Sequence, residues 1–411
     1  MPRYTWPSPP LVQPISIADG ANLDAFSRLR VSNPETIFDS KQLWDEQPLF
    51  WSSSTIGSGS AAHEPAEAAT TLTVTSSAGT IIRQTFQRFN YQPGKSQMVL
   101  MTAVPLATGG GSGITASWGP HSTGDGLFFE IADGALGCVV RSSVSGSPVD
   151  SRTEQADWNL DTMDGSGPSG ITLDMSMTQI ALFDFEWLGV GRVRFGWVVD
   201  GTPIYCHEAN HANTIASVYM STPNLPLRYS LVNDGTGAAS TLVHICSTVI
   251  VEGGQNTTGI LRYKSTEGTH VDANAANSIY AIVGIKLKAT HLDAVVELAE
   301  MSMIGQQKND FEWLLYWNPT VADTFTYSDL TNSCVQAARG ATANTISAGT
   351  VIGGGLVAGG NSLGGSVSKE LRNALKLGSS LTGTPDALVL AARPLTANSD
   401  IEGSLSWREL Q

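Results

Sequence analysis

The chain has 411 residues, a formal net charge of −14, 15% charged and 41% hydrophobic residues, and 42 glycines. This acidic balance, without a run of Lys or Arg, argues against nucleic-acid binding, which needs clustered positive charge. The length suffices for two or three domains, and the low charge with abundant glycine favours strands joined by turns over helices.

The N-terminal sixty residues do not have the pattern of a compact domain. Seven of the 19 prolines lie in the first 48 residues, and proline favours an extended path without backbone donors. The segment is also rich in aromatic residues, which a disordered leader would lack. We therefore expect residues 1–60 to be an extended arm that packs on its own body or on a neighbouring subunit. Its assembly residues would be Trp6, Phe26, Phe38, Trp44, Phe50 and Trp51.

Residues 61–254 have the pattern of an antiparallel β-sandwich. Asp133-Gly134 and Asp200-Gly201 each separate two apolar runs, which is a hairpin signal. The alternation in 193–199, with Val, Phe, Trp and Val on one side, predicts a half-buried strand. A further hairpin is predicted around 77–79.

Residues 255–411 predict a second β-sandwich with one short helix. The stretch 253–277 is rich in Gly, Asn and Thr and is expected to be a linker. The segment 311–317 alternates, with Phe311 and Trp317 on the same face as Trp313 and Leu315. The helix is expected near 366–378, where a glycine provides a stop signal.

His207-Glu208-Ala209-Asn210-His211 matches H-E-x-x-H, the zinc-protease pattern. That chemistry needs a helix, on which both imidazoles reach one ion. Here the pattern follows the strand that leaves the Asp200-Gly201 turn, and no helical stripe comes after it. In a strand, positions four apart lie ~13 Å apart. We therefore expect no metal here, no catalytic residues and no cofactor.

Asp161, Asp164 and Asp174 alternate with glycines and could offer oxygen ligands to calcium. The D-x-D-x-D-G order of a calcium loop is absent, and turn formation by aspartate explains the same residues. Turn chemistry is preferred, and calcium near Asp161 and Asp164 stays open.

The four cysteines form no C-x-x-C pair, so reduced and mostly buried thiols are expected. The N-terminus lacks the basic start and apolar run of a signal peptide. No apolar stretch approaches ~18 residues. We therefore expect a protein made in a cytosol, without membrane insertion.

Several blocks of the sequence resemble tailed-bacteriophage virion structural proteins. The block ANLDAFSRLRVSNPETIFDSKQ at 21–42 resembles the N-terminal signature of these proteins, and the other blocks lie at 185–201, 219–231, 244–254, 311–327 and 383–395. The resemblance implies a virion location, homo-oligomers that are often threefold in fibres, and other virion proteins as partners. It also implies concanavalin-like or laminin-G-like sandwiches, a class that often binds glycans.

Three hypotheses follow. The leading one is a non-enzymatic virion component of the tail fibre, collar or adsorption apparatus, with head decoration as a variant, assembling through its N-terminal arm. The second is a receptor module that binds host-surface glycan, with Trp118 and Trp158 as candidate sugar-stacking residues. The third is an enzyme, either a protease or a glycosidase.

Overall fold

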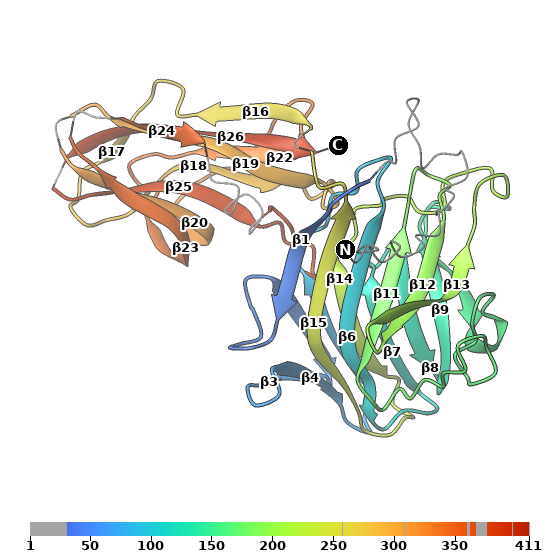
Figure 1. Cartoon of the computed structure of the whole chain (residues 1–411). Coiled ribbons are helices and arrows are strands. Elements are labelled where there is room, and N and C mark those ends of the chain that lie inside the picture. The colour runs from blue at the N-terminus through green and yellow to red at the C-terminus, as the bar shows by residue number, and fades with distance from the viewer. Residues whose placement is uncertain are drawn as a thin grey trace, which may run out of the picture.

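The computed structural model describes residues 31–256, 258–307, 309–359, 376–396 and 398–410, and the backbone of 362–366. It is built almost entirely from antiparallel strands, which form four sheets in two sandwiches (Figure 1). The expected mostly-β, two-sandwich fold class is confirmed. In this part of the chain, the single helical element is the 3-10 turn Gln155–Asp157, and no helix could span a bilayer. Most of the helix expected near 366–378 lies outside the described residues.

The first sandwich pairs an eight-stranded sheet with a seven-stranded sheet. The larger sheet has the order β13-β12-β11-β6-β15-β4-β3, with β1 also paired to β15, and the smaller has the order β10-β9-β8-β7-β14-β5-β2. The larger sheet contains β1 (Pro34–Lys41), β3 (Ser60–Glu64), β4 (Ala69–Val74), β6 (Gln97–Thr108), β11 (Gln179–Phe185), β12 (Val193–Val199), β13 (Thr202–Ala209) and β15 (Ser240–Glu252). The smaller contains β2 (Trp51–Gly57), β5 (Gly79–Thr85), β7 (Ile114–Pro120), β8 (Gly126–Ala132), β9 (Ala135–Ser142), β10 (Val149–Glu154) and β14 (Leu227–Asn233).

The two Asp-Gly turns form hairpins as predicted. Asp133 and Gly134 have φ values of 51° and 85°, and Asp200 and Gly201 have 51° and 76°. Positive φ at both central residues is the type I′ geometry, whose twist matches that of the flanking strands. These turns set the register of β8 on β9 and of β12 on β13.

The predicted hairpin around 77–79 is wrong. β4 and β5 flank this turn, but β4 pairs with β3 and β15 in one sheet, whereas β5 pairs with β2 and β14 in the other. The turn therefore crosses from sheet to sheet. Both strands have the same alternation that a hairpin would have, because each also covers the common core.

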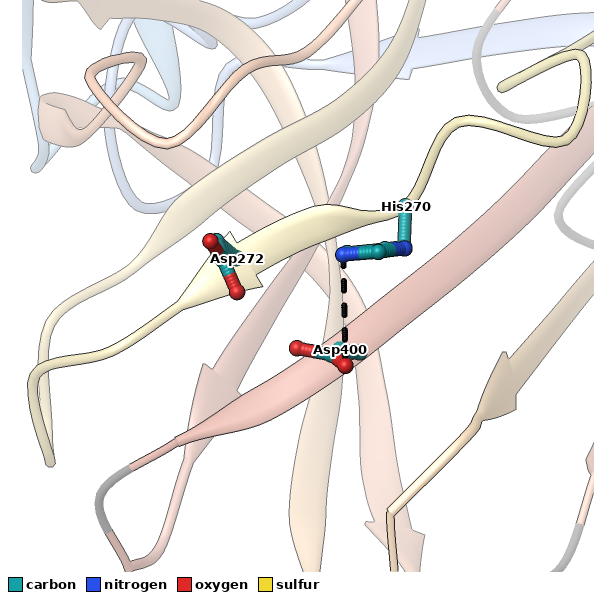
Figure 2. A group of neighbouring side chains, drawn as sticks. All are labelled: His270, Asp272 and Asp400. Atoms are coloured by element: carbon teal, nitrogen blue, oxygen red, sulfur yellow. Dashed lines mark ion pairs between the residues drawn. The ribbon is translucent and has the colours of Figure 1, made fainter.

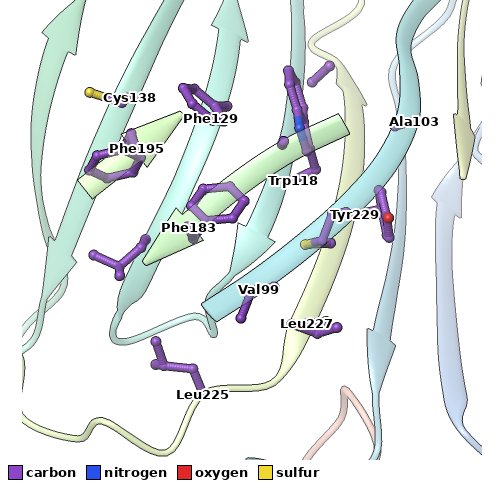
Figure 3. Packing of buried hydrophobic residues seen from close by; sticks show 14 of the residues in the cluster. Val99, Ala103, Trp118, Phe129, Cys138, Phe183, Phe195, Leu225, Leu227 and Tyr229 are labelled. Atoms are coloured by element: carbon purple, nitrogen blue, oxygen red, sulfur yellow. The ribbon is translucent and has the colours of Figure 1, made fainter. Parts of the chain in front are cut away.

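Aromatic side chains fill the first core. Phe129 of β8 packs on Phe183 of β11, at a centroid distance of 5.3 Å (Figure 3). It also packs on Trp197 of β12, at 4.3 Å. Val193, Phe195 and Trp197 are all buried, which confirms the predicted alternation of that strand. Rings from both sheets therefore interdigitate in a single core.

Part of the expected N-terminal arm belongs to the first sandwich. β1 pairs with β15, and β2 pairs with β5. Phe38 and Trp51 are buried in the core that these sheets enclose, and Phe50 packs against it. Burial on the chain's own body explains why this proline-rich segment also carries aromatics. Trp6 and Phe26 lie outside the described residues.

The second sandwich pairs a five-stranded sheet, β16-β26-β19-β24 with β17 on β26, with a six-stranded sheet, β21-β22-β18-β25-β20-β23. The five-stranded sheet contains β16 (Ile260–Ser265), β17 (Val271–Ala273), β19 (Val295–Gly305), β24 (Ser362–Ser366) and β26 (Ser399–Leu410). The six-stranded sheet contains β18 (Tyr280–Leu287), β20 (Phe311–Val321), β21 (Ser328–Asp329), β22 (Val335–Arg339), β23 (Ile346–Val357) and β25 (Ala387–Pro394).

Two expectations for this half need refinement. The stretch 253–277, expected to be a linker, contains β16 and β17, both paired with β26. On β20 the predicted face is formed by Phe311, Leu315 and Trp317, which are buried. Leu314 and Tyr316 on the opposite face are also buried, because a second small cluster covers that side.

Short contacts join the two sandwiches where they meet (Figure 1). Lys376 forms an ion pair with Glu297 at 3.0 Å, with both side chains almost fully buried, and it also donates to Gln255. The backbone amide of Ser379 donates to the carbonyl of Phe86 at 3.0 Å. The segment that begins at Lys376 therefore contacts both sandwiches.

Candidate binding cleft and exposed aromatic loop

A cleft of about 620 Å³ opens along one edge of the first sandwich. β10 ends one sheet and β13 ends the other, so the two edge strands flank an opening that no other strand of the described residues covers. The loop 211–219, which follows β13, supplies part of its wall. The cleft exists because β10 and β13 come from different sheets.

The cleft wall combines aliphatic and hydroxyl side chains. Val140, Val144 and Val149 provide apolar surface, and Ser142 and Ser151 provide hydroxyl groups. Val144 and Val149 are exposed. Such a wall suits a ligand that has both apolar faces and hydroxyl groups.

The far wall is held in place by an imidazole stacked on a phenol. The rings of His211 and Tyr219 are 4.2 Å apart and nearly parallel, at 6°. His211 Nδ1 lies 2.7 Å from the carbonyl oxygen of Gly191, and the Tyr219 hydroxyl donates to the carbonyl of Glu186 at 2.9 Å. Burial raises the pKa of Tyr219 well above its usual value. This wall is therefore neutral at Tyr219 and fixed by two separate backbone contacts.

The first three residues of the H-E-x-x-H pattern lie on a strand, as predicted, but the prediction is wrong for its second histidine. His207 and Glu208 are on β13, whereas His211 lies beyond its end. Glu208 pairs with Arg192 at 3.6 Å, and its carboxylate also accepts from Asn210. Both histidines line the cleft. Burial lowers the pKa of His207, opposed by the charge of Glu208.

Trp118 and Trp158 cannot stack on a sugar, contrary to the expectation. Trp118 on β7 (Figure 3) is fully buried and packs on Phe129. It also packs on Trp197. Trp158 is 5% exposed, packs on Phe129, and donates from Nε1 to the carbonyl of Thr153 at 3.3 Å. Their glycine-rich surroundings suggested exposed loops, but both rings complete the core.

The aspartates between 161 and 174 have local hydrogen-bond partners. Asp161 accepts from the backbone amides of Met163 and Ser169 at 2.9 and 2.8 Å. Asp164 accepts from Ser166 and Thr162, and these hydrogen bonds lower its pKa to about 2. Each carboxylate therefore closes its own turn, which is the turn chemistry that the sequence favoured.

The loop 42–50 between β1 and β2 presents an exposed indole. Trp44 is 89% exposed, and its neighbours Leu43 and Leu49 are 46% and 37% exposed. The fully buried Arg83 holds the base of the loop, donating to the carbonyl of Glu46 at 2.6 Å and to the side chain of Gln42 at 3.2 Å. A loop tied to a buried guanidinium can present a tryptophan in a defined position.

Comparison with known proteins finds no matching family model and no matching curated protein. Solved structures with a similar arrangement include sugar-binding β-sandwiches and phage proteins. The CBM2 module of the Lactobacillus casei BL23 phage J-1 evolved Dit shares 6% identity, over 55% of this chain and 100% of that chain, with a TM-score of 0.37. The endo-1,3-beta-glucanase of Streptomyces sioyaensis shares 10% identity, over 53% of this chain and 96% of that chain, with a TM-score of 0.35. The Emp47p carbohydrate recognition domain shares 12% identity, over 53% of this chain and 96% of that chain, with a TM-score of 0.33. At these TM-scores the likeness carries no information on function.

Proposed function

We propose that this chain is a non-enzymatic structural component of a tailed-phage virion, which assembles with copies of itself through the loop 42–50. A place in the tail fibre, collar or adsorption apparatus is preferred over head decoration. The resemblance of the sequence blocks to virion proteins supports a place for this chain in a virus particle. The exposure of Trp44 supports the mode of assembly.

Trp44 carries the proposal because its exposure is costly unless a partner covers it. Burying a large apolar side chain contributes about 1.5–3 kcal/mol, and tryptophan is enriched among the residues that dominate interface energies. Leu43 and Leu49 extend the apolar surface on the same loop. Together they form an anchor with apolar flanks.

The anchoring of the loop reduces the entropic cost of docking. Gln47 accepts from Gln42 and Ser40, and the Trp51 indole donates to Ser40 at 2.8 Å. Groups that are already ordered lose little conformational freedom on association. We take the partner to be a second copy of the chain, since symmetric self-assembly repeats one anchor at every interface.

The test compares Trp44→Ala with Met177→Ala, which removes another exposed apolar side chain from the same sandwich. Analytical ultracentrifugation of the full chain should show an oligomer for the unmodified protein and for Met177→Ala, and dissociation for Trp44→Ala. Thermal unfolding of isolated Trp44→Ala should match the unmodified monomer, because the indole has no core role. An oligomer that persists in Trp44→Ala, or a monomeric unmodified protein, would refute this mode of assembly.

Imaging then addresses the position in the particle. Virions carrying a tagged copy of this chain should show label at the tail by electron microscopy. Label over the capsid would favour head decoration instead, and particles without label would contradict a virion role.

A second candidate function is glycan binding in the cleft, favoured by its combination of valine and serine side chains. Sugars present hydroxyl groups and apolar faces, which such a wall can contact. Ser151→Trp on the edge strand β10 should fill the cleft and abolish binding on a glycan array. Ser60→Trp, on the edge strand β3, is the matched control and should bind as the unmodified protein does. Equal binding by both variants, or none by the unmodified protein, would remove this candidate.

A further inference from the structure

Three metal-ligating side chains meet on the outer face of the five-stranded sheet of the second sandwich. His270 precedes β17, Asp272 lies on β17, and Asp400 lies on β26 (Figure 2). One ligand atom from each lies within 4.8 Å of the others. Within the described residues, this is the only such group.

The core determines how these side chains are presented. Val271 and Ala273 on β17 are fully buried, as is Ile401 on β26. Because side chains alternate along a strand, the residues between them must point outward. The packing of these buried residues therefore fixes the positions of Asp272 and Asp400, whose side chains point outward.

The pairing places two carboxylates face to face. Asp272 lies directly opposite Asp400 in the antiparallel register, between Val271↔Ile401 and Ala273↔Ser399. Like charges at directly opposite positions destabilise a strand pair. A cation between the two carboxylates would turn this repulsion into attraction.

The neighbouring groups leave the negative charge of the pair largely uncompensated. His270 Nε2 is 3.9 Å from Asp400 Oδ2, and this is the one ion pair to Asp272 or Asp400 among the described residues. Gln307 donates to Asp400 at 2.9 Å, which orients that carboxylate without neutralising it. Glu402 lies two residues further along β26, on the same outward face, and adds another carboxylate.

The same face also has a groove of about 440 Å³ directly alongside. Tyr263, Ile304, Glu402 and Ser404 are among its lining residues. Tyr263 is exposed. Glu402, which lines the groove, is two residues from Asp400 on β26. An ion held by Asp400 would therefore lie next to this groove.

The geometry points to a divalent transition-metal site formed by His270, Asp272 and Asp400, for which Zn²⁺ is the best match. One imidazole nitrogen with two carboxylate oxygens suits zinc, whereas calcium prefers oxygen ligands alone. Ligand atoms about 2.0–2.2 Å from zinc in a tetrahedral arrangement lie about 3.4 Å apart. His270 and Asp272 are exposed, so their side chains are free to rotate toward this spacing, and water would complete the shell.

A bound ion would fasten β17 to β26. β17 has only three residues, and within the described part of the chain it pairs with β26 alone. Coordination across this pair adds a link that the backbone ladder lacks. The proposed ion therefore stabilises this edge of the second sandwich.

The test measures Zn²⁺ binding by isothermal titration calorimetry of the full chain after removal of metal with a chelator. The unmodified protein should bind Zn²⁺ at this site, and His270→Ala and Asp272→Asn should each weaken that binding by about tenfold or more. The matched control is the double variant His207→Ala, His211→Ala, which removes the H-E-x-x-H histidines and should leave this binding unchanged. This control separates the two histidine-containing regions directly.

Two further readouts protect the test against misfolded variants. Without metal, Asp272→Asn should unfold at the same temperature as the unmodified protein or higher, because it removes a like-charge contact. With Zn²⁺, hydrogen exchange at 271–273 should slow in the unmodified protein only. The proposal is overturned if the unmodified protein binds no Zn²⁺, if the double variant loses the binding, or if Ca²⁺ binds this site in preference to Zn²⁺.

Discussion

The two sandwiches have the same architecture but differ in how their buried polar side chains are hydrogen-bonded. In the first, His244 is fully buried, and neither ring nitrogen has a hydrogen-bond partner among the described residues. Its ring stacks on Tyr229 at 4.1 Å and meets Trp51 at 4.5 Å. Burial, with the nearby charge of Arg83, holds the pKa of His244 well below its usual value. Aromatic packing therefore keeps this imidazole neutral.

In the second sandwich a buried carboxylate has three hydrogen-bond donors. Glu409 accepts from the backbone amide of Cys334 at 2.9 Å, from the indole of Trp407 at 3.1 Å and from the hydroxyl of Ser333. Burial by itself raises the pKa of Glu409, but hydrogen bonds from Ser333 and Cys334 outweigh it and leave the pKa below its ordinary value. Mild acid is therefore expected to weaken the first sandwich through His244, whereas Glu409 should respond only at lower pH.

The largest expected effect tests whether the two cores are independent. Trp197→Ala in the first sandwich and Trp407→Ala in the second each remove a fully buried indole, which should cost about 3–5 kcal/mol. Hydrogen exchange with mass spectrometry should show lost protection only in the sandwich that carries the change. If either substitution reduces protection equally in both sandwiches, the two cores are not independent.

A smaller effect is expected from Glu409→Gln, which removes the charge and keeps the shape. Hydrogen bonds to charged groups contribute about 1.5–3 kcal/mol each, and part of this should be lost in the free energy of unfolding of the second sandwich. Glu300→Gln, on the exposed part of β19, serves as control and should have little effect. Equal stability of the two variants in denaturant titrations would contradict the role given to Glu409.

The smallest expected effect, per pH unit, is the loss of stability of the first sandwich in mild acid. The pKa of His244 and that of His121 are both held well below 6.5, mainly by burial. Below pH ~6.5 the unfolded chain binds protons that the folded state does not, so stability present above this pH is lost as pH falls, by about 1.4 kcal/mol per pH unit per histidine.

Hydrogen exchange between pH 7 and pH 5, corrected for the intrinsic rate, should show this loss in the first sandwich and not around Glu409, whose lowered pKa places its own loss below about pH 4.5. In the variant His244→Phe, the stability of the first sandwich should fall less steeply as pH falls, because unfolding then takes up one proton fewer. An unchanged slope in that variant would show that His244 is protonated in the folded state.

Local features of this fold could be predicted wherever a few neighbouring residues determine the backbone. The Asp133-Gly134 and Asp200-Gly201 turns need positive φ, and Asp-Gly supplies it at low cost. The alternation of 193–199 was likewise sufficient to place His207 and Glu208 on the next strand, and so to separate them from a helical zinc site. These predictions hold because turn chemistry and strand period act over two to eight residues.

Predictions failed where the outcome depended on distant partners. The turn at 77–79 crosses between sheets, because β4 and β5 find other strands to pair with. Trp118 was expected to be exposed, but β8 and β12 bring Phe129 and Trp197 against it. The cleft lining on β10 carried no local signal, since only the approach of β13 makes it concave.

The amino-acid order alone determined that this protein is built from strands, where several of its tight turns lie, and that its zinc-protease motif would not be helical. Only the tertiary structure decided that Trp44 stays exposed while Trp51 is buried, and that Asp272 faces Asp400 across 128 positions of sequence (400 − 272). The reason is physical: backbone torsion preferences are local, whereas burial and charge proximity depend on which strands pair, and pairing partners are chosen by the whole core.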